Sequence, residues 1–178
     1  MRSAAILALA GSCMVYFGCA PINLQPLDVV EFVDLNRYIG KWYEIAKYPN
    51  SFEAGCVGST AEYGIRDDGR ISVFNTCREG GLDGELRTIE GSARVVDETT
   101  NAKLGVSFFI FEAPYWIIDL DEENYQWAVV GEPSRQFLWI LSRTPQLDDD
   151  VYQGIVDRLP EKGYDPAGLV VTPQPQAE

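Results

Sequence analysis

Residues 36–48 read Asn-Arg-Tyr-Ile-Gly-Lys-Trp-Tyr-Glu-Ile-Ala-Lys-Tyr, the most informative segment of the chain. After Gly40, apolar and polar side chains alternate, which indicates a strand that is half-buried on one face. A glycine at its start suits a place where the backbone bends or comes close to another segment. With period two, the side chains expected to face inward are Trp42, Glu44, Ala46 and Tyr48, and those expected to face outward are Tyr43, Ile45 and Lys47.

Seven further runs with strand patterns follow, and turn signals separate them. We place these strands at residues 57–65, 71–76, 85–96, 103–111, 115–120, 125–131 and 137–143. Their connections are short and contain no helix, which excludes a parallel sheet because parallel strands need long crossovers. Consecutive antiparallel strands in this number can close into a barrel that has no exposed edges and holds one small ligand. The sequence therefore predicts an all-β fold, an eight-stranded antiparallel up-and-down β-barrel.

After the last of these strands the pattern predicts one C-terminal α-helix, packed outside the barrel. Asp148 can cap this helix, and the two aspartates that follow it suit a helix N-terminus. The residues that share its apolar face are Val151, Tyr152, Ile155, Val156 and Leu159. A short final strand is expected at residues 168–172. We expect the barrel domain to span residues 34–173, with a disordered tail at 174–178.

Composition narrows the classes of function. The chain has 178 residues, of which 46% are hydrophobic, enough for one domain with its own core. Its 14 Lys and Arg against 27 Asp and Glu give a formal net charge of −13, which opposes electrostatic binding to nucleic acid and to anionic lipid head groups. The absence of histidine removes the commonest general base and the commonest metal ligand. We therefore expect no nucleic acid partner, no metal, no cofactor and no catalytic residue.

The N-terminal segment predicts secretion and lipid attachment. Residues 1–18 combine an early arginine with an apolar run that is too short to span a membrane, as in a signal peptide. The run ends in Gly18-Cys19, which resembles the bacterial lipobox with Cys19 as the acylated first residue. Cys13 is a rival, but lipidation there would leave an odd thiol in an oxidising compartment. We favour Cys19, followed by a tether over residues 19–33, with an ordinary cleaved signal as the alternative.

Two further cysteines, Cys56 and Cys77, then remain in the mature chain. The sequence Asp-Asp-Gly at residues 67–69 predicts a tight hairpin between the strands at 57–65 and 71–76. Folding that hairpin back brings the two cysteines close together. We expect a disulfide between them, and a pair of buried thiols is the alternative.

Three longer blocks carry a family resemblance: RYIGKWYEIAKYP at 37–49, VSFF at 106–109 and FLWILSRTP at 137–145. In this order and spacing they resemble the lipocalin family, and within it the bacterial outer-membrane lipocalins of the apolipoprotein D-like branch. The resemblance runs from about residue 32 to about residue 173, nearly the whole mature chain. It implies the same barrel that the strand pattern predicts.

The resemblance also implies structural roles. The family's Gly-x-Trp motif corresponds here to Gly40 and Trp42. Its late arginine corresponds to Arg143, which is expected to lie across Trp42 and close the narrow end of the barrel. Such a contact contributes roughly 1–2 kcal/mol when desolvated. Asp121 matches the aspartate of a second motif, in the turn before the seventh strand, although the flanking residues differ.

A ligand cavity is the leading expectation for the interior. If Arg143 faces the inner end, period two sends Leu141, Trp139 and Phe137 inward as well. The complete set of expected ligand-binding residues is Tyr48, Phe74, Phe108, Trp127 or its neighbours, Phe137 and Trp139. The alternative is that these aromatic side chains simply fill the barrel as core.

The resemblance implies a function in the envelope of a Gram-negative bacterium. It implies an outer-membrane lipoprotein that faces the periplasm and that stores or transports a fatty acid or a lysophospholipid for envelope maintenance. The alternatives are a lipid-modifying enzyme of the same fold and a structural lipoprotein with a filled barrel. The lack of histidine, of a Gly-x-Ser-x-Gly elbow and of a Cys-x-x-Cys pair argues against an enzyme. The sequence leaves open whether the protein forms a homodimer across the barrel mouth.

Overall fold

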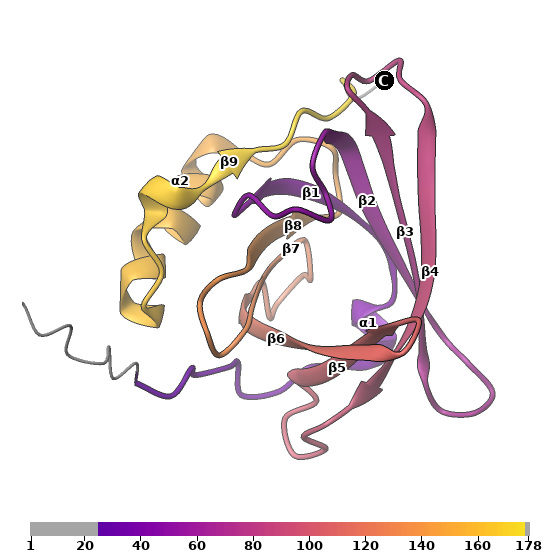
Figure 1. Ribbon diagram of the computed structural model, residues 1–178. Coiled ribbons are helices and arrows are strands. Elements are labelled where there is room, and N and C mark those ends of the chain that lie inside the picture. The colour runs from indigo at the N-terminus through magenta and orange to yellow at the C-terminus, as the bar shows by residue number, and fades with distance from the viewer. Residues whose placement is uncertain (1–24, 177–178) are drawn as a thin grey trace, which may run out of the picture.

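The computed structural model describes residues 25–176, and its main feature is a closed β-barrel (Figure 1). Each strand pairs antiparallel with the next, and β1 pairs with both β2 and β8, which closes the barrel. This confirms the predicted eight-stranded up-and-down fold. The strands are β1 (Gly40–Lys47), β2 (Cys56–Ile65), β3 (Ile71–Glu79), β4 (Leu86–Val95), β5 (Lys103–Phe108), β6 (Phe111–Leu120), β7 (Trp127–Gly131) and β8 (Leu138–Ser142).

The two ends of the barrel differ. At one end, here called the closed end, the short helix α1 (Leu35–Tyr38) packs into the barrel interior. The sequence analysis did not predict this helix. The opposite or open end carries the loops at 48–55, 80–85, 109–110 and 132–137, and it faces the viewer in Figure 1.

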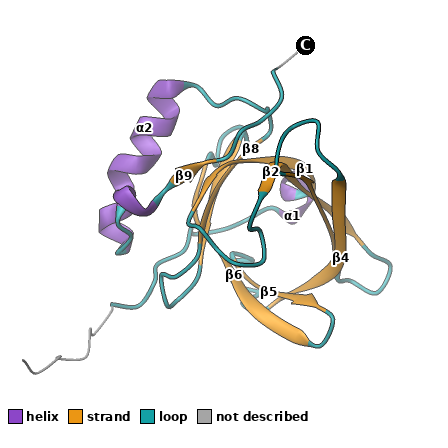
Figure 2. Ribbon diagram, turned by 45° about the horizontal axis from the view of Figure 1, so that its top comes forward, coloured by secondary structure: helices purple, strands orange, loops and turns teal. Residues whose placement is uncertain are grey.

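Helix α2 (Asp149–Arg158) lies outside the barrel, as predicted (Figure 2). The Asp148 side chain caps it by accepting a hydrogen bond of 2.9 Å from the backbone N–H of Asp150. Its buried residue, Ile155, joins a hydrophobic cluster on the outer surface of β1, β7 and β8. A second cluster, which contains Trp42, fills the interior toward the closed end. The barrel wall is therefore buried on both faces beneath α2.

The C-terminal residues complete the wall of the barrel. The pairing of β1 with β2 covers only Gly40–Tyr43, and toward the open end the two strands separate. The 3-10 turns η1 (Leu159–Lys162) and η2 (Pro166–Gly168) lead to β9 (Val170–Val171), which pairs with β1 there. On the other side, the backbone N–H of Gly58 in β2 donates to the carbonyl of Pro173 at 2.8 Å.

Residues 170–174 therefore fill the space between β1 and β2, and we call them the C-terminal stave. Gln174, expected to begin a disordered tail, instead donates hydrogen bonds from Nε2 to the carbonyls of Glu44 at 2.8 Å and Ser59 at 2.9 Å. At the other end of the chain, part of the expected tether is also packed. Val33 is fully buried, and its N–H donates to the carbonyl of Thr100 at 2.7 Å.

One hairpin differs from its prediction. The expected strand at 103–111 ends at Phe108, and β6 begins at Phe111, so Phe109 and Ile110 form the turn. The turn could not be predicted from the sequence, because Phe and Ile favour strands and no Gly or Pro is present at this position. The neighbouring prediction of a disulfide is confirmed, since Cys56 and Cys77 are bonded across β2 and β3 near the open end. Among the described residues, no helix is long and apolar enough to cross a membrane.

Candidate functional site: the barrel interior

Arg143 and Trp42 form the floor of the barrel at the closed end. The guanidinium carbon of Arg143 lies 3.7 Å from the centre of the indole ring. The guanidinium nitrogens donate hydrogen bonds to the carbonyls of Arg37 at 2.6 Å, Lys41 at 3.0 Å and Tyr125 at 3.2 Å. One arginine thus joins α1, the start of β1 and the loop before β7. This arrangement closes the barrel and offers no reacting group.

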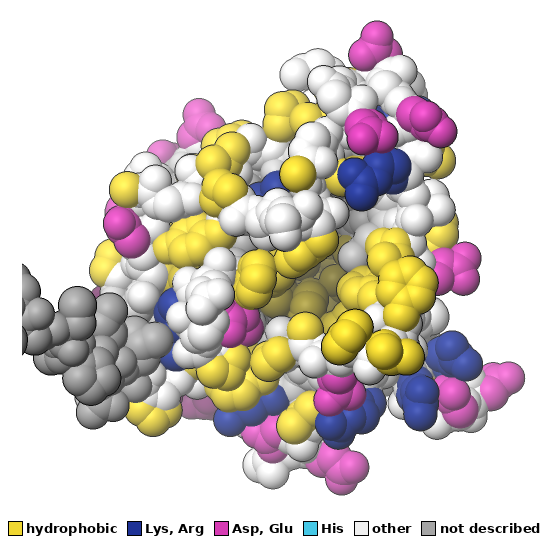
Figure 3. Space-filling view, viewed as in Figure 1, with side chains coloured by type: hydrophobic (Ala, Val, Ile, Leu, Met, Phe, Trp, Pro, Cys, Tyr) yellow, Lys and Arg dark blue, Asp and Glu magenta, His cyan; other side chains and the backbone are white. Residues whose placement is uncertain are grey.

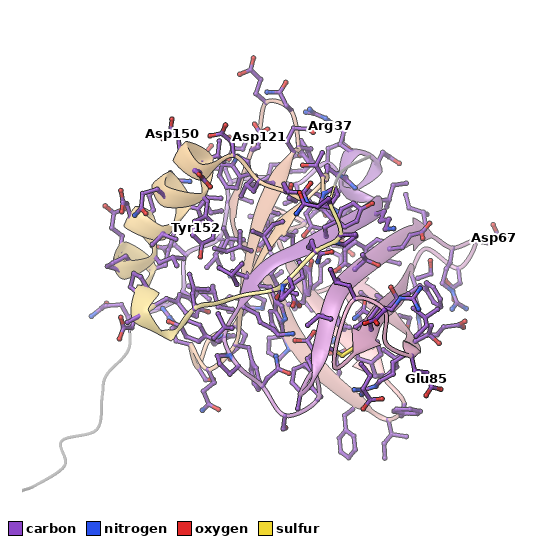
Figure 4. The ribbon with its side chains drawn as sticks, turned by 90° about the horizontal axis from the view of Figure 1, so that it is seen from above. Arg37, Asp67, Glu85, Asp121, Asp150 and Tyr152 are labelled. Carbon is purple, nitrogen blue, oxygen red and sulfur yellow. A yellow bond between two sulfur atoms is a disulfide. The ribbon has the colours of Figure 1, made fainter. Side chains whose placement is uncertain are left out.

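The other two motif residues shape the same end. Gly40 has φ of +94°, and a Cβ added there would lie 3.4 Å from Nη1 of Arg143, so glycine suits both the backbone and the space. The Asp121 carboxylate accepts hydrogen bonds from the backbone N–H groups of Asn124 at 3.1 Å and Gln126 at 3.2 Å, which fixes the turn. Figure 4 labels Asp121 at this end of the barrel and Glu85 nearer the other.

Three tyrosines form the next layer toward the open end. The hydroxyl of Tyr115 lies 2.8 Å from that of Tyr38 and 3.0 Å from that of Tyr63. Burial raises the pKa of Tyr63 to about 12, and it raises the pKa values of the other two phenols well above the usual range. Beside these rings lies an apolar cavity of about 10 Å³, room for one water at most. The closed half of the barrel is therefore filled.

The open half is hollow. Figure 3, which looks into the open end, shows a depression lined with hydrophobic side chains. At this end Phe137 and Trp139 stack with ring centres 6.0 Å apart, and the ring of Phe52, from the loop after β1, lies 5.6 Å from that of Phe137. Phe108, on β5, packs against the interior cluster. Trp139 also packs against the interior cluster and Phe137 stacks on it, so three of the expected lining residues, Phe108, Phe137 and Trp139, lie on the inner side of the barrel.

A buried polar cluster lies on the β1 side of this space. Nζ of Lys47 lies 2.8 Å from Oε1 of Glu44 and 3.3 Å from Oε2 of Glu53. The Trp139 indole N–H donates to Oε2 of Glu53 at 3.3 Å. Thr172, from the C-terminal stave, donates its hydroxyl to Oε1 of Glu44 at 2.6 Å. The interior therefore offers one ammonium and two carboxylates close together.

Burial and the neighbouring Glu53 raise the pKa of the Glu44 carboxyl, against the opposing effects of Lys47 and Thr172. Burial alone would lower the pKa of Lys47, but the two carboxylates outweigh burial, so its pKa is raised and the ammonium stays protonated. With both glutamates ionised the cluster has a net charge of −1. A second anion would therefore be unfavourable beside it.

Three expected lining residues face outward instead, which corrects the prediction. Tyr48 and Trp127 pack with the outer cluster next to α2, and Phe74 is 37% exposed on the outside of β3. For Tyr48 the reason is a register shift between Glu44 and Ala46 in the pairing with β8, a β-bulge that reverses the alternation.

The same bulge explains a missed residue. Lys47, expected to face outward, turns into the barrel and meets Glu44. In β7 the inward residues are Ala128 and Val130, and Ala128 is one of the two neighbours of Trp127 that the sequence analysis allowed. In β3 the adjacent Val73 takes the interior position.

Sequence reasoning also missed Phe52, Glu53 and the three tyrosines. Phe52 and Glu53 lie in a loop, where no periodicity shows which way a side chain points. For Tyr63 and Tyr115, the period of two shows which residues share a face of the strand but not which face is the inner one. A residue on the same strand whose inward direction is known would have settled this, as Ile117 does for Tyr115. Within residues 25–176, no three His, Cys, Asp or Glu side chains are grouped so that they could hold a metal ion. Cys19 lies outside the described residues.

Comparison with known proteins matches this architecture. A sequence profile of the lipocalin-like domain matches residues 33–174. The outer membrane lipoprotein Blc of Vibrio cholerae is 39% identical over 160 residues, which cover 88% of this chain and 91% of that protein. Blc of Escherichia coli K12 is 37% identical over 177 residues, 98% of this chain and 99% of that protein. Bovine apolipoprotein D is 36% identical over 154 residues, 82% of this chain and 79% of that protein.

A solved structure shows the same fold. Insecticyanin from the tobacco hornworm superposes with a TM-score of 0.68, covering 90% of this chain and 89% of that one. Its sequence identity is 23%, so this likeness concerns the fold alone.

Proposed function

The chain belongs to the lipocalin family, and from that premise we propose that it is a binding protein whose open half-barrel holds one acyl lipid, a fatty acid or a lysophospholipid. The observation that carries the proposal is the aromatic hollow at the open end above a filled floor. Flat, rigid rings such as Phe137 and Trp139 give an alkyl chain a large apolar surface at little cost in conformational entropy. Each methylene removed from water contributes about 0.8 kcal/mol.

The depth of the hollow limits what it accepts. Because the tyrosine layer and the Arg143–Trp42 floor fill the closed half, an acyl chain enters only as far as Tyr63 and Tyr115 unless these rings move. The polar cluster on β1 lies beside Trp139, and with both glutamates ionised it has a net charge of −1. An anionic head group is repelled from it, so the head group of the ligand stays at the open end, in contact with water.

The site supports binding better than catalysis. The acidic and basic groups in the interior, Glu44, Lys47 and Glu53, are already paired with one another. The hydroxyls of Tyr38, Tyr63 and Tyr115 have raised pKa values, which disfavours the phenolate that a nucleophile or base would need. A lipid-modifying activity would show as turnover of an added lipid, which we do not expect.

For location, we propose attachment to the outer membrane of a Gram-negative bacterium through a lipid on Cys19, with the barrel in the periplasm. The support is the signal sequence at residues 1–18 and the likeness to proteins named as outer membrane lipoproteins. Two acyl chains give stable anchoring where one does not. If a Cys19→Ser variant still carried acyl chains in its measured mass, Cys19 would not be the lipidated residue.

Fluorescence titration tests the binding site. A fatty acid and a lysophospholipid are each added to a chain that begins at Ala20, and the quenching of tryptophan is followed alongside the heat of binding. Trp139→Phe should abolish most of the quenching while the heat remains, because the apolar surface is kept. Trp127→Phe, outside the barrel, is the matched control and should change neither. Absence of saturable binding, or quenching that survives Trp139→Phe, would overturn the proposal.

A further inference from the structure

The turn between β5 and β6 is the most exposed apolar segment of the described chain. Phe109, Ile110 and Phe111 are 91%, 87% and 77% exposed. These three residues stand at the open end, directly beyond the interior residue Phe108. We call them the apolar tip. Apolar side chains grouped so fully in water mark a surface that another molecule covers.

The backbone adds a second cost to this arrangement. Phe109 has φ of +60°, a left-handed conformation that bulky L residues rarely adopt. A glycine or asparagine would form the same turn with less strain. The fold therefore holds a phenylalanine ring in solvent against both its backbone preference and the hydrophobic effect. Nothing in the isolated domain compensates for the strained backbone or for the exposed ring.

The tip continues an apolar rim around the barrel mouth. Phe52 in the loop after β1 is 56% exposed, and Leu82 and Leu86, which flank the turn into β4, are 43% and 52% exposed. These side chains come from different loops of the same end, and Figure 3 shows hydrophobic side chains gathered there around the hollow. Through Phe52, whose ring lies 5.6 Å from that of Phe137, the rim reaches the candidate ligand site.

Charge argues for an apolar rather than an electrostatic partner. The tip has no charged residue, and the nearest ion pair is neutral overall, with Nη2 of Arg94 2.7 Å from Oε1 of Glu112. The whole chain has a formal net charge of −13, which opposes approach to any strongly anionic surface.

The N-terminal end of the described chain lies at the same end of the barrel. The carbonyl of Gln25 accepts a hydrogen bond of 2.7 Å from Nη2 of Arg135, which lies in the open-end loop between β7 and β8. Cys19 is six residues before Gln25, so an extended chain between them spans at most about 20 Å. A lipid anchor at Cys19 would therefore hold the open end near the membrane and direct the apolar tip toward it.

We propose that the apolar tip inserts into the lipid surface of the membrane and docks the open end of the barrel on it. Large aromatic and aliphatic side chains are those that partition into the boundary between head groups and acyl chains. Docked in this way, the hollow opens onto the membrane, and an acyl chain passes between the two without crossing bulk water. The proposal rests on the proposed function for the identity of the cargo, but docking itself does not require a ligand.

Vesicle binding tests the docking directly. The chain from Ala20, which contains every described residue and lacks the anchor, is mixed with vesicles of phosphatidylcholine and phosphatidylethanolamine and sedimented. A triple variant, Phe109→Ser, Ile110→Asn and Phe111→Ser, should bind about 100-fold more weakly, because three large apolar side chains leave the interface. The matched control, Phe32→Ser with Ile65→Thr, alters residues that are 53% and 52% exposed away from the open end, and it should bind as the wild type does.

The outcomes separate docking from ligand binding. Titration with a soluble lysophospholipid should give the same affinity for the triple variant and the wild type, since the hollow is unchanged. Equal vesicle binding by the triple variant and the wild type would overturn the docking proposal whatever the titration shows. So would a wild type that sediments as a dimer without vesicles while the triple variant is a monomer, because the tip would then be covered by a second copy. Tighter binding to vesicles that contain phosphatidylglycerol would also contradict an apolar insertion.

Discussion

At the scale of single residues, Arg143 stabilises the closed end through both the face and the edge of its guanidinium. The face lies over Trp42, and the edge donates hydrogen bonds to backbone carbonyls of three separate segments. A cation over a buried indole and charge-assisted hydrogen bonds are each worth more than an exposed ion pair. Arg143 therefore contributes more to stability than a surface arginine in an exposed ion pair does.

We expect Arg143→Ala to lower the free energy of unfolding by about 3 kcal/mol, measured by urea denaturation with Trp42 emission as the probe. Arg94→Ala is the control, because Arg94 makes a two-bonded pair with Glu112 on the outer surface of the barrel. That control should leave the unfolding midpoint nearly unchanged. Equal losses in the two variants would mean that the stacked geometry at the closed end has no special value.

The tyrosine layer should make the stability of the protein depend on pH in the alkaline range. The pKa of Tyr63 rises from 10.0 to about 12 on folding, so the folded state holds this proton more tightly than the unfolded state does. Stability from this group is complete below pH 10 and is lost as pH rises through 12. Tyr63→Phe should therefore be about 1 kcal/mol less stable than the wild type at pH 8, since the hydrogen bond to Tyr115 is gone.

That gap should shrink between pH 10 and pH 12, as thermal unfolding over this range would show. An unchanged gap across the range would contradict the burial of an un-ionised phenol. Tyr43, which lies on the outer side of β1, provides the control through Tyr43→Phe.

At the scale of elements, the C-terminal stave is the part of the barrel wall with the least support. It is held by two residue pairs with β1, by the bond from Gly58 and by the side chains of Thr172 and Gln174. A chain that stops at Val171 should expose the edges of β1 and β2 toward the open end. We expect the backbone amide of Gly58, which donates to the carbonyl of Pro173, to lose protection in hydrogen exchange, while the amides of β5 and β6 keep it.

A chain that stops at Gln176 is the control for this truncation and should exchange like the full chain. If the chain that stops at Val171 also left the Gly58 amide protected, β1 and β2 would have to pair without the stave.

The disulfide between Cys56 and Cys77 joins β2 and β3 near the open end, across a sequence separation of 21 residues. Closing a loop of this size contributes about 3 kcal/mol, mainly by restricting the unfolded chain. We therefore expect a reductant to lower the Tm of the wild type. The double variant Cys56→Ala with Cys77→Ala should have that lower Tm with or without reductant. A Tm that does not respond to reductant in the wild type would show that the bond adds nothing to stability.

Strand order and barrel closure could be predicted from the sequence because they depend on alternation summed over many residues. The direction of a single side chain could not be predicted where an irregularity such as a β-bulge interrupts the alternation. The bulge between Glu44 and Ala46 turned Tyr48 outward and Lys47 inward, and no residue type announces such a bulge. On β8, where the alternation is unbroken, Trp139 and Leu141 were placed correctly from Arg143 alone.

At the scale of the whole molecule, the barrel divides into two halves with different roles. The closed half is filled by the floor, the tyrosine layer and the interior cluster, and it supplies the stability. The open half supplies the hollow, the polar cluster on β1 and the apolar tip. Ligand binding and membrane contact then both depend on the open half, and stability depends on the closed half. Substitutions in the open half should therefore leave the stability of the barrel largely unchanged.

Native mass spectrometry with lipid extraction shows directly whether the open half holds an acyl lipid. The chain from Ala20 is purified from bacteria without detergent, together with Ala113→Trp and Ser107→Trp. Ala113 lies opposite the interior residue Val106, so its replacement fills the hollow, whereas Ser107 is on the outer face. We predict one acyl lipid bound to the wild type and to Ser107→Trp, and none to Ala113→Trp. An empty wild type, or a lipid that Ala113→Trp retains, would contradict the account.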